Sequence, residues 1–384
     1  MLIDYRFSSP EGDILLEPED LARPFLLSPL KPHPFLTLRD YFEAIQTFLL
    51  RDEGMCLMNF LETKGIGQDG RAGIQRIGIR SEKHGVLYHV ASVEIVFHDT
   101  TVRLAVSTAI SEQGKACLAN EYDMLTFFYQ SLRRSYLPEV YEKGDMVCQD
   151  GHHHRETLTL MLFEWFEGFH EWHFSMDERN RCQKVCVWDL EKGHRYASDN
   201  EMFDLFRQAS KILTLCYDTR TFKQIYPWHH AAGDFIVKTG DDGIRVKLTT
   251  VRDYRSIMGC FSEDAVHPMI ALVYFFLNLT IQMRLDKLDG VGKTVWAGDF
   301  SVQAVIQGFF DALEMKAEED TSLPAQTHEF LSLLQSFNED EFERLTGPLM
   351  EFYHQRSAAD FPVIDANLKS HLSLLSRVLH QFRR

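Results

Sequence analysis

The side chains best suited to proton and metal chemistry lie in residues 225–254. His229 is one of two consecutive histidines, and an imidazole can accept a proton near neutral pH. Asp234 and Asp253 are separated by about the length of one β-hairpin, so both carboxylates could reach one metal ion. These residue types and this spacing permit a metal site beside a proton acceptor, without requiring one. A packing histidine with two solvated loop carboxylates is the competing interpretation.

Other segments also contain residue types that could bind a metal or a phosphate, but their patterns support such sites less well. Residues 152–154 are three histidines in a polar loop and are expected in solvent. His170 and His173 are expected on one face of a helix, but a zinc site needs further ligands. Residues 290–294 (GVGKT) are similar to the end of a phosphate-binding loop. That pattern requires a glycine where Lys287 stands, and a strand before it where a helix is expected.

The elements that would position these residues fall into two parts. In the first part, apolar and polar residues alternate in three segments, a pattern typical of an antiparallel meander. A helix and two more strands follow, with a polar loop between these strands. The three strands, the helix and the two later strands are expected at residues 74–79, 86–97, 101–110, 115–134, 140–142 and 158–164.

After Gly168 the pattern becomes mainly helical, with helices expected over residues 201–219 and from 264 to the end. A chain of 384 residues is too long for a single compact core. We therefore expect an α+β protein with three parts. Residues 1–70 form an N-terminal extension with a helix, residues 71–168 a small β-rich lobe, and residues 169–384 a large, mostly helical lobe.

A short connector lies between the two lobes. Residues 160–168 (LMLFEWFEG) are an apolar strand that ends in an acidic–aromatic–acidic–glycine turn, where a planar base could bind exposed backbone groups. The segment resembles the hinge of aminoglycoside phosphotransferases and choline kinases. Residues 120–125 (NEYDML), 227–237 (PWHHAAGDFIV) and 246–254 (VKLTTVRDY) are similar, in the same order, to other motifs of that family.

The resemblance implies a protein-kinase-like, two-lobed fold that binds ATP and magnesium between its lobes. With the motifs aligned on Gly233, Asp234 takes the place of the family's metal-binding asparagine. His229 takes the place of the catalytic aspartate, and Asp253 that of the second metal ligand. The resemblance therefore implies magnesium at Asp234 and Asp253, with His229 as the base.

The resemblance also implies nucleotide contacts, with departures from the family pattern. Glu164 and Phe166 would lie near the base, and Glu121 is the glutamate that pairs with a phosphate-binding lysine in the family. The third strand carries no such lysine. Arg103 is the cation that could replace it, although a guanidinium fork does not act like a point-charge ammonium.

Composition excludes some classes of partner. The formal net charge is −16, and a field of that sign disfavours nucleic acid and anionic membrane surfaces. The chain opens without the basic and apolar segments of a secretory signal, and its seven cysteines show no disulfide or zinc spacing. A cytoplasmic location with reduced thiols is expected. The oligomeric state is left open.

Three functions remain in view. The first is an ATP- and magnesium-dependent phosphotransferase that acts on a small hydroxylated substrate. The second is a catalytically inactive, pseudokinase-like regulatory protein that binds a nucleotide or another ligand. The third sets the resemblance aside and leaves an α+β protein whose helical C-terminal half mediates assembly.

Overall fold

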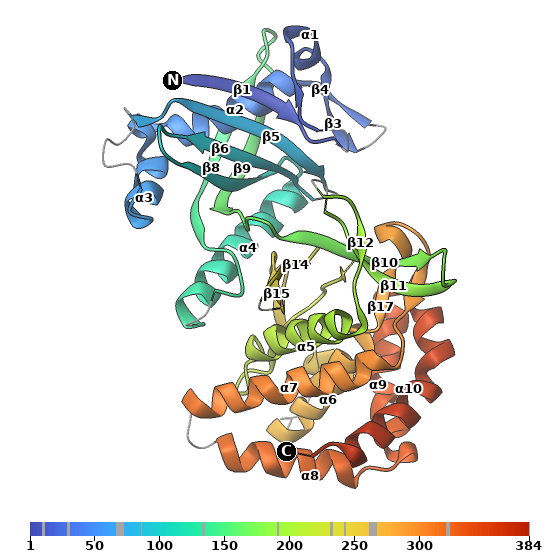
Figure 1. Ribbon diagram of the computed structural model, residues 1–384. Helices are drawn as coiled ribbons and strands as arrows, with labels where there is room; N and C mark the ends of the chain where they lie inside the picture. The colour runs from blue at the N-terminus through green and yellow to red at the C-terminus, as the bar shows by residue number, and fades with distance from the viewer. Residues whose placement is uncertain are drawn as a thin grey trace. The chain divides into compact units, whose positions relative to one another are not determined.

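A computed structural model describes residues 1–9, 12–28, 31–66, 73–85, 87–132, 135–189, 192–230, 233–241, 243–260, 267–319 and 323–383. The chain is an α+β protein that divides into two compact units, Met1–Glu167 and Gly168–Arg384 (Figure 1). The boundary lies inside the connector that the sequence indicated.

Unit 1 is built on a seven-stranded mixed sheet in the order β2-β1-β5-β6-β7-β9-β8. Strand β1 pairs with β5 in parallel, and every other pair in this sheet is antiparallel. The strands are β1 (Leu2–Phe7), β2 (Ile14–Leu15), β5 (Arg76–His84), β6 (His89–Val96), β7 (Thr101–Ala109), β8 (Val140–Gln149) and β9 (Arg155–Glu164). The predicted three-strand meander is confirmed. The loop predicted between the last two strands is wrong, because residues 143–149 continue β8 and leave only a tight turn.

Residues 1–70 were expected as an extension, but their described residues share the core of unit 1. The predicted helix is two helices, α2 (Leu38–Leu50) and α3 (Met55–Thr63), separated by a short 3-10 turn. Helix α2 begins with a capping box, in which Thr37 and Asp40 bond each other's backbone N–H groups. Its apolar face, including Phe42, Ile45 and Phe48, packs into the same core as the sheet.

A hairpin and one further helix complete unit 1. Strands β3 (Pro24–Ser28) and β4 (Lys31–Thr37) form a separate two-stranded sheet after the short helix α1 (Pro18–Leu21). Helix α4 (Glu112–Ser131) lies between β7 and β8 in the chain, close to its predicted position. Ser111 caps it by accepting a hydrogen bond from the N–H of Gly114.

Unit 2 begins with strands where the sequence predicted helix. Its five-stranded sheet has the order β12-β11-β10-β14-β15. The strands are β10 (His170–Asp177), β11 (Cys182–Val187), β12 (Arg195–Tyr196), β14 (Phe235–Gly240) and β15 (Gly243–Leu248). The predicted helix bearing His170 and His173 is therefore wrong, because both residues lie on β10.

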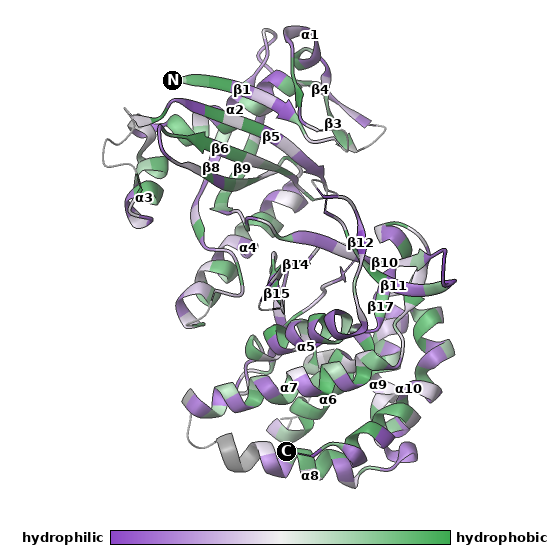
Figure 2. Cartoon of the chain, viewed as in Figure 1, coloured by the Kyte–Doolittle hydropathy of each residue, from purple (hydrophilic) through white to green (hydrophobic). Residues whose placement is uncertain are grey.

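The helices of unit 2 largely follow the sequence prediction, but the helix expected before residues 290–294 is wrong, because β17 (Leu285–Lys287) and β18 (Thr294–Trp296) form a hairpin there. The helices are α5 (Asp199–Leu215), α6 (Pro268–Gln282), α7 (Phe300–Glu319), α8 (Leu323–Ser336), α9 (Glu339–Arg356) and α10 (Phe361–Gln381). Helix α6 is hydrophobic along most of its length and is mostly buried (Figure 2). Among the described residues, no helix combines the length and the apolar character needed to span a membrane.

Helices α5 and α7 approach each other closely at Gly308. A Cβ atom placed on Gly308 would lie 2.0 Å from the carbonyl oxygen of Arg207 in α5. Only a residue without a side chain permits this approach. The contact is one of backbone against backbone, so it cannot be relieved by rotation of a side chain.

We expect Gly308→Ala to lower the free energy of unfolding of unit 2 by about 1–3 kcal/mol, because the two helices must separate. Urea unfolding followed by tryptophan fluorescence measures it, since Trp172, Trp188, Trp228 and Trp296 all lie in this unit. Gly259→Ala is the control, because a Cβ there meets nothing within 4 Å. Equal stability of the two variants would contradict the prediction.

Candidate functional site

The candidate site is formed in a loop of unit 2 by the described residues 227–230, 233 and 234. It follows β13 (Lys223–Ile225), which pairs with β16 (Tyr254–Ser256), and it leads into the β14–β15 hairpin. A cis peptide bond joins Tyr226 and Pro227 at its start. The loop is held at its far end by the N–H of Thr249, which donates to the carbonyl oxygen of Asp234 at 2.7 Å. The loop and residues 249–253 therefore lie side by side.

Asp234 is the most fully buried member of the site, with 1% of its side chain exposed. Both of its carboxylate oxygens accept hydrogen bonds from the two terminal nitrogens of Arg252, each at 2.5 Å. The backbone N–H of His229 donates to the same carboxylate at 2.7 Å. This bidentate, charge-assisted arrangement satisfies the buried negative charge.

Asp253 has a different partner and a different environment. Its carboxylate lies 2.9 Å from Nε of Arg255, and 35% of its side chain is exposed. The two carboxylates predicted to share a metal are thus each held by a separate arginine. Among the described residues, no group of three or more His, Cys, Asp and Glu side chains is placed to hold a metal ion.

His229 lies mostly buried among charged groups. Burial lowers the pKa of its imidazole, while the carboxylates of Asp360 and Asp234 oppose this effect. The cations Lys287 and Arg252 lower the pKa further. The imidazole is therefore held towards its neutral form, in which one ring nitrogen can accept a proton.

The next histidine along the loop has a packing role. The ring of His230 is fully buried and lies 4.4 Å from the ring of Trp172, with Trp228 and Phe235 also in contact. Gly233 then turns the chain with φ near +71°, and a Cβ there would lie 2.5 Å from the carboxylate of Glu171. The positive φ and the close carboxylate favour a glycine at this turn.

Lys287 and Thr294 form a second polar group near His229. The Lys287 ammonium lies 3.1 Å from the carboxylate of Asp360, and the Thr294 hydroxyl donates to the same oxygen at 2.8 Å. Both residues belong to the hairpin of β17 (Leu285–Lys287) and β18 (Thr294–Trp296). Residues 290–294, which resembled a phosphate loop, are the turn of this hairpin and its first β18 residue, with no helix directly after them.

Four further residues that the sequence singled out lie in unit 1. Arg103 on β7 pairs with Glu94 at 3.0 Å and with Glu167 at 3.4 Å. Glu121 on α4 is buried and accepts a hydrogen bond from the hydroxyl of Tyr88. Arg103 therefore does not pair with Glu121 in the way that the family's lysine would.

The two connector residues predicted to lie near a nucleotide base, Glu164 and Phe166, are at the end of β9 and just after it. Glu164 ends β9, and its carboxylate accepts a hydrogen bond from the N–H of Glu139 at 3.3 Å. Phe166 is half-buried just after the strand. The strand end that was expected to offer backbone groups to a base is present at Glu164.

The sequence reasoning missed Arg252, Lys287 and Asp360. Arg252 stands directly before Asp253 in the quoted VKLTTVRDY segment, so a cation next to a predicted metal ligand was the available signal. Lys287 and Asp360 are far apart in the chain, and no local pattern joins them. Their proximity is a property of the fold.

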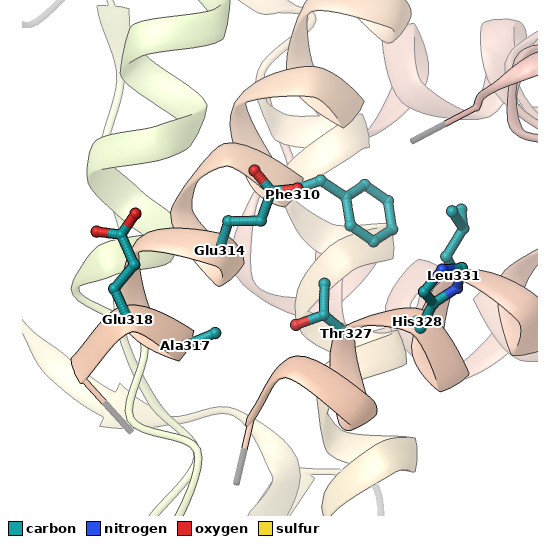
Figure 3. A pocket seen from close by; sticks show the side chains of 7 residues that line it. All are labelled: Phe310, Glu314, Ala317, Glu318, Thr327, His328 and Leu331. Carbon is teal, nitrogen blue, oxygen red and sulfur yellow. The ribbon is translucent and has the colours of Figure 1, made fainter. Parts of the chain in front are cut away.

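A pocket of about 470 Å³ lies elsewhere in unit 2, between α7 and α8 (Figure 3). Its walls include Phe310, Glu314 and Leu331. None of the residues predicted from the sequence lines it. Two glutamates, a histidine and a threonine are its polar side chains, and they provide no arrangement for catalysis.

No family model matches the chain, and no curated protein matches it significantly.

The hydrogen bonds of Asp234 leave its carboxylate poorly placed to coordinate a metal ion. A magnesium ion needs oxygen ligands that are free to coordinate it. The oxygens of Asp234 are instead engaged by a guanidinium, which supplies the positive charge that a cation would otherwise bring. A metal could enter only after Arg252 moved away.

Proposed function

We propose that the chain is a kinase-like protein that does not transfer phosphoryl groups and acts as a ligand-binding or regulatory protein. The observation that carries this proposal is the buried ion pair of Asp234 and Arg252. It takes up the carboxylate that a phosphotransferase of the resembled family would need for magnesium.

The order of elements supports the kinase-like part of the proposal. In unit 1, three antiparallel strands, a helix and two further strands follow one another and end at the connector. In unit 2, helix α5 precedes a short strand, the loop with Asp234 and a two-stranded hairpin. This is the succession that the resemblance implied around residues 120–125, 160–168, 227–237 and 246–254.

The replaced residues support the inactive part. No lysine stands on β7, and Arg103 is engaged by two glutamates. His229 stands where the family has its catalytic aspartate. Phosphoryl transfer depends on positioned magnesium, a cation on the phosphates and a group that orients the acceptor, and each of the three is altered here.

The alternative is an ATP-dependent phosphotransferase of a small hydroxylated substrate. In it, Asp234 and Asp253 would hold magnesium and His229 would accept the proton. The lowered pKa of His229 favours this alternative, because a neutral imidazole is a competent base. It requires Arg252 to release Asp234, which makes the two functions separable by experiment.

We expect the purified chain to form no ADP from ATP and magnesium when amino sugars, cholines and amino alcohols are offered as acceptors. We also expect any thermal stabilisation by ATP to be the same with magnesium as with a chelator, because Asp234 is not available to the metal. Coupled ADP detection and thermal unfolding measure the two quantities.

An active aminoglycoside phosphotransferase assayed in parallel is the positive control. Acceptor-dependent ADP formation that disappears in both His229→Ala and Asp234→Asn would overturn the proposal in favour of the alternative. ADP formation that persists in both variants would indicate a contaminating enzyme.

A further inference from the structure

One face of the β10–β11–β12 sheet carries an unusual set of side chains. The cross-strand pairs His173–Cys186 and Cys186–Tyr196 place these three residues on the same face. Ser175 and Trp188 lie on that face too, because they are two residues along from His173 and Cys186. The opposite face bears Trp172 and Phe174, which are fully buried.

This face forms a pocket of about 410 Å³ within unit 2. Ser175 and Cys186 are each 6% exposed and form its floor. Trp188, His194 and Tyr196 supply aromatic rings to its walls, and the rings of Trp188 and His194 are 5.5 Å apart at 81°. A pocket of this size accepts a small molecule or one side chain.

The acidic residues of the pocket are Glu178 and Asp289. The hydroxyl of Ser175 donates to the carboxylate of Asp289 at 2.5 Å and fixes its direction. Asp289 also adopts a left-handed backbone conformation, with φ of 52°. Within the part of the chain that the structure describes, neither carboxylate forms an ion pair.

Two cations on the strands β11 and β12 have other partners. Lys184 lies 3.5 Å from the carboxylate of Asp177, and Arg195 pairs with Glu201 at 2.8 Å. The carboxylates of Glu178 and Asp289 lie beside the aromatic walls.

The phenol of Tyr196 reports the same negative environment. Its pKa is raised, first by desolvation and then by interaction with Cys186 and with the carboxylates of Asp177, Asp289 and Glu178; the Cys186 thiol itself is neutral near pH 7, because burial raises its pKa. A negative potential next to aromatic rings stabilises a positive charge, because the face of an aromatic ring also attracts cations.

We propose that this pocket binds a small organic ammonium cation, with Trp188 and Tyr196 against its apolar groups and Asp289 against its charge. The proposal depends on the sheet face and its acidic rim, and does not depend on the kinase-like resemblance. A positively charged nitrogen bearing carbon substituents satisfies both features of the pocket, whereas a metal ion would not use the aromatic walls.

The experiment titrates the full chain with tetramethylammonium chloride and follows the indole N–H signals of the five tryptophans by NMR. The Trp188 signal is assigned by its absence in Trp188→Phe. We expect this signal to shift saturably, with no such shift for equal concentrations of sodium chloride or of tert-butanol, an uncharged solute of similar size.

Two variants separate the contributions of charge and ring. Asp289→Asn removes the charge but keeps an oxygen for Ser175, and asparagine tolerates the left-handed backbone. We expect it to weaken binding about three-fold or more. Trp188→Leu, followed through the remaining indole signals of unit 2, is expected to weaken binding about five-fold. Asp365→Asn, on the exposed side of α10, is the matched control and should leave the affinity unchanged.

An equal response to sodium chloride would show only an ionic-strength effect and would overturn the proposal. Equal binding of tert-butanol would show an apolar pocket without cation selectivity, with the same consequence. Unchanged affinity in both Asp289→Asn and Trp188→Leu would place the cation elsewhere.

Discussion

Arg252→Ala is expected to lower the free energy of unfolding of unit 2 by about 3–5 kcal/mol. The substitution leaves the carboxylate of Asp234 with 1% of its side chain exposed and without the guanidinium that binds both of its oxygens. An unpaired buried charge costs far more than the loss of one exposed ion pair. Urea unfolding followed by tryptophan fluorescence measures the change.

The neighbouring ion pair provides a matched control. Arg255→Ala removes a guanidinium that is 50% exposed from Asp253, which is 35% exposed. That pair is expected to contribute less than about 1 kcal/mol. The double variant Arg252→Ala/Asp234→Asn should recover much of the loss, because an amide carries no charge and still accepts the hydrogen bond from His229. Similar losses for Arg252→Ala and Arg255→Ala would contradict the role given to Asp234.

Acidification from pH 6.5 to pH 5 is expected to lower the stability of unit 2 by about 3 kcal/mol. Burial lowers the pKa of His230 and of His371 to about 3, with smaller contributions from His229 and Arg284 respectively. The unfolded chain binds protons at these histidines below about pH 6.5, whereas the folded chain does not. Stability therefore falls with decreasing pH, by about 1.4 kcal/mol per histidine and pH unit, until the folded pKa is reached.

Urea unfolding at pH 7, 6 and 5 measures this slope. His371 lies between the hydroxyl of Thr280 at 3.3 Å and the guanidinium of Arg284 at 3.4 Å, so its ring is held in one neutral form. His371→Gln should reduce the slope by about one proton, while the same exchange at the exposed His328 should not. A slope that His371→Gln leaves unchanged would show that other groups govern the pH dependence.

The sequence predicted the elements whose faces differ clearly in polarity. Strands β5, β6 and β7 alternate between apolar and polar residues, and α5 carries an apolar stripe and a Ser198 capping box. Strand β10 was missed because both of its faces are covered. Its Trp172 and Phe174 are buried on one side and its His173 and Ser175 on the other, so the alternation is weak.

Less of the candidate site could be predicted from the sequence, because it depends on contacts between segments that are distant in the chain. The sequence located the loop at His229 and Asp234, and it gave the glycine of the turn. It could not show that Arg252 reaches back to Asp234, because side-chain pairing across a hairpin leaves no periodic signal. For the same reason the predicted partnership of Asp234 with Asp253 had no support other than the resemblance.

The parallel pairing of β1 with β5 has a consequence for biosynthesis. Leu2 to Phe7 are synthesised before their parallel neighbour in the sheet, which begins at Arg76, and both α2 and α3 are made in between. Strand β2 can pair with β1 early, but the edge of β1 that pairs with β5 has to wait until β5 has been made, and loop-closure entropy opposes this later pairing. The β1–β5 pair therefore forms only after α2 and α3 have been synthesised, so this part of the sheet is not assembled in chain order.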